Sequence, residues 1–152
     1  MRVGLISDTH GLLRPEAVER LRGAAHIIHA GDIGGAEILA GLRALAPLTA
    51  VRGNNDRAPW ANAVRATETV QIGKVRVYVV HDLAELDIDP AADGFRIVVS
   101  GHSHRPLIQE RAGVLYVNPG SAGPRRFRLP VAVARLEIEG TDVRATIEEL
   151  EV

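Results

Sequence analysis

The sequence VGLIS, at residues 3–7, is a short apolar segment that runs directly into the polar residues Asp8-Thr9-His10. The same succession of apolar strand and polar cluster recurs in HIIHAGD at residues 26–32 and in LTAVRGNND at residues 48–56. Between these segments the apolar side chains are spaced as in helices. Strand, helix, strand, helix and strand joined by short links predict parallel βαβ units.

The remainder of the chain changes character, because Val- and Ile-rich runs follow one another with Gly, Pro or Asp turns between them. Two helices are expected, at residues 15–22 and 35–45. Strands are expected at residues 3–7, 26–30, 48–52, 69–72, 74–80, 96–100, 107–111, 114–117, 131–139 and 143–149, and the last two form a hairpin. Mixed strands with few helices predict an α/β fold in which two sheets pack face to face with helices outside, as one domain over residues 1–152.

Composition narrows the chemistry that this chain can carry. It has 152 residues and no cysteine, which excludes disulfides, thiolate metal sites and cysteine nucleophiles. The net charge of −1 and the 3% aromatic content do not indicate a nucleic-acid partner. No signal peptide or membrane-spanning run is recognisable, so a cytoplasmic protein is expected. Self-association of the chain is left open.

Polar residues with metal-binding side chains close five of the expected strands. Side chains at the carboxyl ends of strands in an α/β sheet share one crevice, so these clusters can converge although they lie far apart in the sequence. The residues concerned are Asp8, His10, Asp32, Asn54, His81, His102 and His104. Any one cluster alone is more often a turn or a structural histidine, but their joint occurrence at strand ends favours a metal site.

These clusters resemble the motif set of the calcineurin-like metallophosphoesterase superfamily, in particular its small single-domain bacterial and archaeal phosphodiesterase branch. The matching motifs are D-x-H at 8–10, G-D at 31–32, G-N-x-D at 53–56, His81, G-H-x-H at 101–104 and N-P-G-S at 118–121. The resemblance implies a four-layer αββα sandwich with two divalent ions. One ion would be held by Asp8, His10, Asp32 and His104, the other by Asp32, Asn54, His81 and His102, with Asp32 as the bridge.

The resemblance also implies a reaction, the hydrolysis of a phosphate ester, with a phosphodiester favoured. Two ions lower the pKa of a bridging water, so that hydroxide attacks phosphorus in line with the leaving group. Manganese is expected first, with nickel, cobalt, zinc and iron as alternatives that nitrogen and oxygen donors also suit. A phosphomonoesterase acting on a nucleotide or small metabolite, and a non-catalytic scaffold of the same fold, remain as alternatives.

One position departs from the pattern of many superfamily members, which have histidine after the motif's asparagine. Here that position is Asn55, which cannot act as an acid and is instead expected to orient a phosphate oxygen. Its neighbour Asp56 is expected at the catalytic site, fixing the loop or a ligand histidine. Whether any residue serves as general acid is left open. Two further histidines, His26 and His29, are expected to be structural.

Loop arginines form the last candidate feature. They would provide either a cationic rim for the substrate or ordinary solvated charge, and the sequence does not decide between the two. The residues are Arg105, Arg125, Arg126 and Arg128. The N-P-G-S segment likewise would supply either backbone amides near the phosphate or a plain turn.

Overall fold

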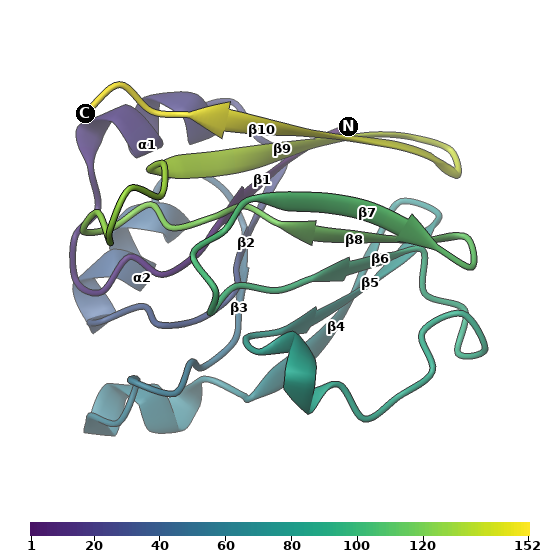
Figure 1. The fold of residues 1–152 in the computed structure, drawn as a ribbon, viewed down its shortest axis with the longest axis horizontal. Helices are drawn as coiled ribbons and strands as arrows, with labels where there is room; N and C mark the ends of the chain where they lie inside the picture. Colours follow the sequence, from purple (N-terminus) through teal and green to yellow (C-terminus); the bar gives the residue numbers. More distant parts are fainter.

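Two five-stranded mixed sheets and two α-helices make up the computed structural model, which describes residues 1–152 (Figure 1). The first sheet contains β1 (Arg2–Ile6), β2 (His26–His29), β3 (Leu48–Ala50), β9 (Ala132–Glu139) and β10 (Asp142–Glu149). The second contains β4 (Thr67–Ile72), β5 (Val75–Val80), β6 (Ile97–Val99), β7 (Leu107–Arg111) and β8 (Val114–Asn118). The helices are α1 (Pro15–Leu21) and α2 (Ala36–Arg43), and two 3-10 turns are η1 (Pro59–Ala63) and η2 (Leu83–Glu85).

Each sheet has three parallel strands side by side. The first sheet has the order β10-β9-β1-β2-β3, in which β1, β2 and β3 are parallel and β9 and β10 are antiparallel additions. The second has the order β4-β5-β6-β8-β7, in which β5, β6 and β8 are parallel and β4 and β7 are antiparallel edges. The parallel βαβ units and the C-terminal hairpin are therefore confirmed.

The main core lies between the two sheets. Alternate residues of β1, Val3 and Leu5, point into this interface, and Ile6 packs on the helix side of its sheet. In β5, Val77 and Val79 point inward, whereas Tyr78 belongs to a separate cluster on the outer face. This alternation is the two-residue period of a strand. Because both faces are covered, these strands read as continuous apolar runs in the sequence.

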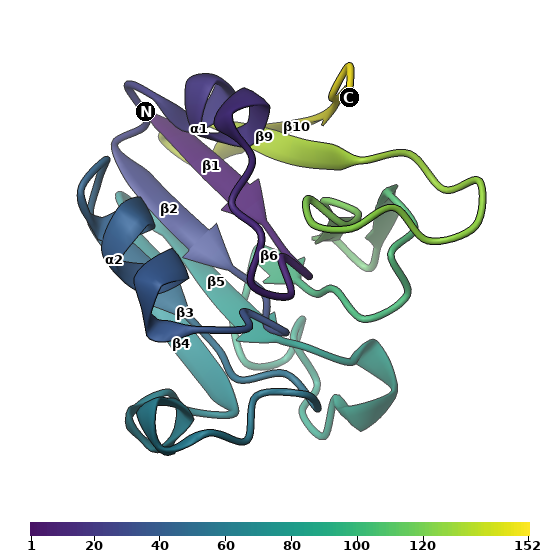
Figure 2. The same cartoon turned by 90° about the vertical axis from the view of Figure 1, so that its left-hand side faces the viewer.

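The outer faces of the two sheets are covered differently. Helices α1 and α2 pack on the first sheet, where Figure 2 shows them in front of β1 and β2. The outer face of the second sheet is covered by the segment that contains η2 and Leu86 to Phe95. The predicted architecture of two mixed sheets packed face to face with helices outside is confirmed, and η1 and η2 are elements that the sequence did not predict. No helix is both long and apolar enough to span a membrane.

Candidate metal centre

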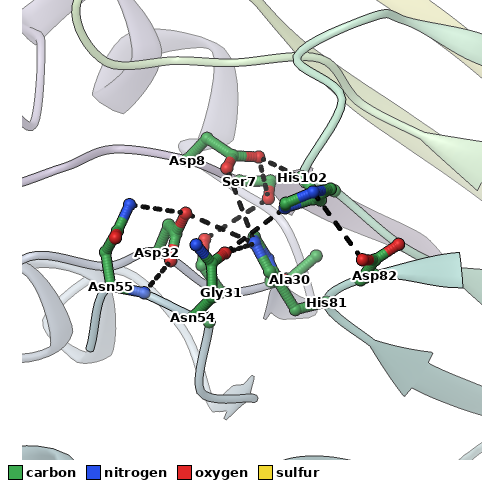
Figure 3. A network of polar contacts seen from close by, with 12 residues as sticks. Ser7, Asp8, Ala30, Gly31, Asp32, Asn54, Asn55, His81, Asp82 and His102 are labelled. Atoms are coloured by element: carbon green, nitrogen blue, oxygen red, sulfur yellow. Dashed lines mark hydrogen bonds and ion pairs between the residues drawn. The ribbon is translucent and has the colours of Figure 1, made fainter. Parts of the chain in front are cut away.

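The carboxyl ends of the parallel strands bring all seven predicted ligands to one place. Loops after three strands of the first sheet and two of the second meet there, and Figure 3 shows side chains from both sheets pointing toward one another. Asp8 and His10 follow β1, Asp32 follows β2, Asn54 follows β3, His81 follows β5, and His102 and His104 follow β6. The convergence that was expected from the strand pattern is thus present in the structure.

Asp8 is fully buried and its two carboxylate oxygens have different surroundings. Its Oδ2 accepts hydrogen bonds from the Ser7 hydroxyl at 2.7 Å and from the backbone amide of His102 at 3.1 Å. Its Oδ1 lies 3.3 Å from Nε2 of His104 and 3.8 Å from Nε2 of His10. Neither Asp8 Oδ1 nor His10 Nε2 has a hydrogen-bond partner, although both atoms are buried. Buried polar atoms without partners are rare, and a cation between them would satisfy both.

Asp32 lies between two groups of histidines. Its Oδ2 is 3.3 Å from Nε2 of His81 and 3.7 Å from Nε2 of His10, while its Oδ1 accepts a hydrogen bond from the backbone amide of Asn55 at 2.9 Å. His81 Nε2 is also 3.9 Å from Asp8 Oδ1. One oxygen of each carboxylate is therefore held by the fold, and the other faces the histidines. Asp32 Oδ2 is therefore within 3.7 Å of one histidine from each predicted ligand set.

Asn54 joins His81 to the remaining ligand histidine, His102. Its Oδ1 lies 3.1 Å from Nε2 of His81 and 3.3 Å from Nδ1 of His102. On the far side of its ring, His81 Nδ1 lies 2.7 Å from the carbonyl oxygen of Ala30. That nitrogen must carry the proton to donate to a carbonyl, so in the neutral imidazole, the form that binds metal, Nε2 has its lone pair directed at the site.

Backbone conformation at the site is unusual. Seven residues other than glycine have positive φ angles, and five of these are predicted ligands, with φ between 47° and 70°. The five are Asp8, His10, Asp32, His102 and His104. Such angles are uncommon outside glycine, and they cluster where a surrounding structure imposes them for a functional purpose.

Two glycines permit the carboxylates to be buried so closely. A Cβ atom on Gly53 would overlap the backbone and carboxylate of Asp32, and one on Gly101 would overlap the Ser7 hydroxyl and approach Asp8 Oδ2 to 2.7 Å. Neither glycine can therefore carry a side chain unless the adjacent carboxylate moves. Their place in the G-N-x-D and G-H-x-H motifs follows from this close approach.

Electrostatics keep both carboxylates ionised. Burial alone would raise the pKa of Asp8, but contacts with His104 and the Ser7 hydroxyl outweigh burial and lower it. Burial opposes ionisation of Asp32 too, yet His81 and the amide of Asn55 lower its pKa to about 2. Burial would lower the pKa of His81, and Asp32 more than compensates, so that pKa is raised. Two buried carboxylates that stay charged are an environment suited to cations.

Asn55 and Asp56 lie beside the ligands in different roles. Asn55 holds Asp32 through its backbone amide and places its side-chain Nδ2 3.4 Å from Asp32 Oδ2. Asp56 is buried and accepts hydrogen bonds from the backbone amides of Ile33, Gly34 and Gly53 at 2.9–3.1 Å. Of the two roles expected for Asp56, the structure shows the one that fixes the loops.

Several residues that support the site were not predicted from the sequence. Asn118, in the N-P-G-S segment, donates to the carbonyl of Gly101 at 2.9 Å and to the Ser103 hydroxyl at 3.1 Å. From the same segment, Ser121 donates to the carbonyl of Asp8 at 3.0 Å. This segment therefore braces the loops that carry the ligands. The motif gave the only sequence signal for it, and it was interpreted as a phosphate contact or a turn.

The other two histidines lie outside the cluster. His29 Nδ1 accepts the backbone amide of Gly31 at 3.0 Å, and its Nε2 lies 3.0 Å from the Thr9 hydroxyl. His26 Nε2 lies 2.8 Å from the Thr49 hydroxyl. Both nitrogens of His29 are thus used within the fold, as expected of a structural histidine.

The donor set fits divalent metal ions. Nitrogen and oxygen donors within 4.8 Å of one another form two groups around Asp8, one with His10 and His104 and one with Asp32 and His81. Imidazole and carboxylate suit manganese, iron, cobalt, nickel and zinc. The site opens on the side of His102 and His10, whose side chains are 46% and 22% exposed, whereas His81 and His104 are buried.

Comparison with known proteins agrees with this geometry. Residues 1–141 match the calcineurin-like phosphoesterase superfamily domain. A probable metallophosphoesterase of Methanothermobacter thermautotrophicus is 35% identical over 158 residues, covering 97% of this chain and 91% of that protein. Among solved structures, an archaeal phosphodiesterase has a TM-score of 0.79 at 23% identity, with 97% and 100% of the two chains covered. Vps29 of Chaetomium thermophilum also has a TM-score of 0.79, at 18% identity and with coverages of 99% and 97%.

Proposed function

The chain belongs to the calcineurin-like phosphoesterase superfamily, and from that membership we propose that it hydrolyses phosphodiesters at a centre of two divalent metal ions. The observation that carries the proposal is the pair of buried, ionised carboxylates whose free oxygens lie 3.3–3.9 Å from Nε2 of His10, His81 and His104. In a purely structural cluster Asp8 Oδ1 and His10 Nε2 would form hydrogen bonds. In this structure both atoms are without partners.

The proposed ligand assignment is the one that the family motifs imply; the donor group of Asp8, His10 and His104 supports its first half, whereas in the second donor group Asp8 lies beside Asp32 and His81. Asp8, His10 and His104 would hold one ion and Asn54, His81 and His102 the other, with Asp32 shared between them. When bound, two such ions supply Lewis-acid stabilisation of the phosphoryl oxygens and a nucleophile from water at neutral pH. Manganese is the ion that we propose first.

The residues of the chain supply positioning and charge. The low pKa of Asp32, about 2, and the lowered pKa of Asp8 keep both carboxylates charged throughout the neutral range. The Ala30 carbonyl fixes the tautomer of His81, and the Asn55 amide holds Asp32 in place. Asn55 carries the side-chain amide that we propose to orient a phosphate oxygen, and it cannot protonate a leaving group.

A hydrolysis assay with purified protein tests the proposal. Bis(p-nitrophenyl) phosphate and p-nitrophenyl phosphate are compared in Mn²⁺, Ni²⁺, Co²⁺, Zn²⁺ and Mg²⁺, and we expect the diester to be hydrolysed faster, with the highest rate in Mn²⁺. Faster turnover of the monoester would instead indicate a phosphomonoesterase. Failure to hydrolyse either ester with metal bound would refute catalysis and favour a scaffold.

A variant with a metal-binding readout completes the test. Asp32→Ala should lose one or both ions, measured as metal per chain after gel filtration, and should lose activity with them. Asp89→Ala is the matched control, because Asp89 is an exposed carboxylate in the loop after η2 and should leave both readouts unchanged. Retention of two ions by Asp32→Ala would show that Asp32 is not the shared ligand.

A further inference from the structure

The loop between β8 and β9 concentrates positive charge and an exposed aromatic ring. Its central residues are Arg125-Arg126-Phe127-Arg128, and in Figure 2 the segment leading into β9 projects from the body of the molecule. The whole chain has a net charge of only −1, so this cluster is a local feature rather than a consequence of composition.

This loop borders the metal centre. Ser121, at its start, donates to the carbonyl of Asp8 at 3.0 Å, and Gly123 packs so closely on the backbone of Asp8 and Thr9 that no side chain fits there. On the other side, Arg105 directly follows His104, which is predicted to bind metal. The start of the loop and Arg105 therefore connect this region to the residues of the metal centre.

Three arginines of this region have no carboxylate partner, whereas four others in the chain do. Ion pairs with glutamates engage Arg20, Arg22, Arg96 and Arg135. Arg105, Arg126 and Arg128 are exposed and form no ion pair with any carboxylate of the chain. Unpaired guanidinium groups beside a phosphoesterase centre are suited to bind phosphate oxygens, which they contact through two parallel hydrogen bonds.

Phe127 is equally unusual among the aromatic residues. Tyr78 and Phe95 are buried and pack edge to face with their ring centroids 5.3 Å apart. Phe127 is 87% exposed and has a φ of 53°, a left-handed conformation that costs energy for a residue with a bulky side chain. It contributes nothing to the core in return. A strained, exposed aromatic side chain indicates a binding role.

Phe127 and two of the arginines line one hollow. Arg105, Phe127, Arg128 and Leu129 line a hollow of about 670 Å³ that is widely open to solvent. Small-molecule sites usually measure roughly 300–1,000 Å³, so the hollow is large enough for a nucleoside. An aromatic face beside guanidinium groups matches the two parts of a nucleotide, a flat base and an anionic phosphate.

We infer that this hollow is a subsite for the nucleoside of a nucleotide-containing phosphodiester, with Phe127 stacked on the base and Arg105 and Arg128 on the adjoining phosphate. The inference rests on the proposed phosphodiesterase activity and names its substrate class. One exposed aromatic ring holds one base, so the substrate is a short nucleotidyl ester and not a long strand. This agrees with the low aromatic content of the chain.

Two esters with the same leaving group test the subsite. Thymidine 5′-(p-nitrophenyl phosphate) and methyl p-nitrophenyl phosphate both react with water, whose oxygen bonds to phosphorus as p-nitrophenolate leaves, and they differ only in the retained group. Phe127→Ala should raise KM for the thymidine ester about 5- to 150-fold, the range of base stacking on one aromatic ring, and leave the methyl ester unchanged. Phe127→Tyr should restore the wild-type value.

The arginine contribution has its own matched control. Arg128→Gln should raise KM for the thymidine ester more than for the methyl ester, and this increase should be smaller at high salt because the contact is ionic. Arg144→Gln removes the same charge from β10, from an exposed arginine that also lacks an ion pair, and should change neither ester. Equal effects of Arg128→Gln and Arg144→Gln on KM would indicate a general effect of net charge and would refute the proposed contact between Arg128 and the phosphate.

Binding of thymidine 5′-monophosphate, measured by calorimetry, separates this inference from the proposed activity because it needs no turnover. Loss of nucleotide affinity in Phe127→Ala supports the subsite even if hydrolysis fails. Turnover of both esters with no effect of Phe127→Ala overturns the subsite and leaves the phosphodiesterase proposal standing. Binding of anionic phospholipid vesicles that depends on Phe127, with unchanged nucleotide affinity, would also overturn it and identify a membrane-contacting loop.

Discussion

The substitution Asp56→Asn tests whether Asp56 stabilises the loops of the site or takes part in the chemistry. The buried carboxylate accepts three backbone amides, from Ile33, Gly34 and Gly53. Asparagine has nearly the same shape but one acceptor oxygen, so if that oxygen keeps the amides of residues 33 and 34, its NH₂ group faces the amide of Gly53. Two donors then meet where a donor and an acceptor had met 2.9 Å apart.

The expected loss of stability in Asp56→Asn follows from these contacts. Hydrogen bonds to a charged acceptor contribute about 1.5–3 kcal/mol and neutral ones about 0.5–1.5 kcal/mol, so each of the two retained bonds weakens by roughly 1 kcal/mol. The buried Gly53 amide left without a partner costs about 1–3 kcal/mol more. We therefore expect Asp56→Asn to lower the free energy of unfolding by about 3–5 kcal/mol.

Urea unfolding of the metal-free protein, followed by circular dichroism, measures this change as a lower midpoint at unchanged slope. Asp89→Asn is the control, because Asp89 is exposed and accepts one loop amide, from Ala92 at 3.3 Å, and should cost less than about 0.5 kcal/mol. If Asp56→Asn unfolds like the wild type but loses turnover with both ions bound, Asp56 acts in the chemistry and the loop-fixing argument is wrong.

Three further predictions concern the neighbourhood of the site. Burial lowers the pKa of His29 to about 4, so the folded protein is fully stable with respect to this group above pH 6.5 and loses about 3 kcal/mol of stability as the pH falls toward 4. In His29→Gln, the urea midpoint should not show this loss of stability between pH 6.5 and pH 4. Ser7→Ala removes a hydrogen bond to Asp8 and should weaken metal binding about 10- to 100-fold by calorimetry; unchanged affinity would show that the bond is dispensable. Asn55→His should accelerate diesters with poor leaving groups more than nitrophenyl esters, and a uniform change in rate would argue against a leaving-group role at this position.

Much of the fold was predictable because it depends on local patterns. The strands that are buried on both faces are continuous apolar runs, and their order between two helical segments implied the parallel units around β1 and β2. The 3-10 turns η1 and η2 were not predicted, since three to five residues without a periodic apolar pattern give no local signal. Helix α2 is shorter than expected and ends at Arg43, where the sequence had suggested Leu45.

The ligands were predictable and their supports were not. Asp8, Asp32 and the histidines stand in motifs whose residue types reveal metal chemistry. Ser121 supports Asp8 from 113 residues away and Asn118 supports Gly101 from 17 residues away, both through backbone carbonyls that any residue could offer. Only the folded chain shows which carbonyl a side chain reaches. The supporting role of Asp56 was expected from its motif, but its three partners are backbone amides that the sequence could not identify.

The cost of the site within the fold argues that it is maintained for function. Five predicted ligands have left-handed backbone angles, which cost a residue with a side chain roughly 1–2 kcal/mol each, and two ionised carboxylates lie buried beside one another. A chain that needed the fold only as a scaffold would gain stability by relaxing these loops. Cations at the proposed centre would offset this cost, because each buried carboxylate would then be paired with a positive charge.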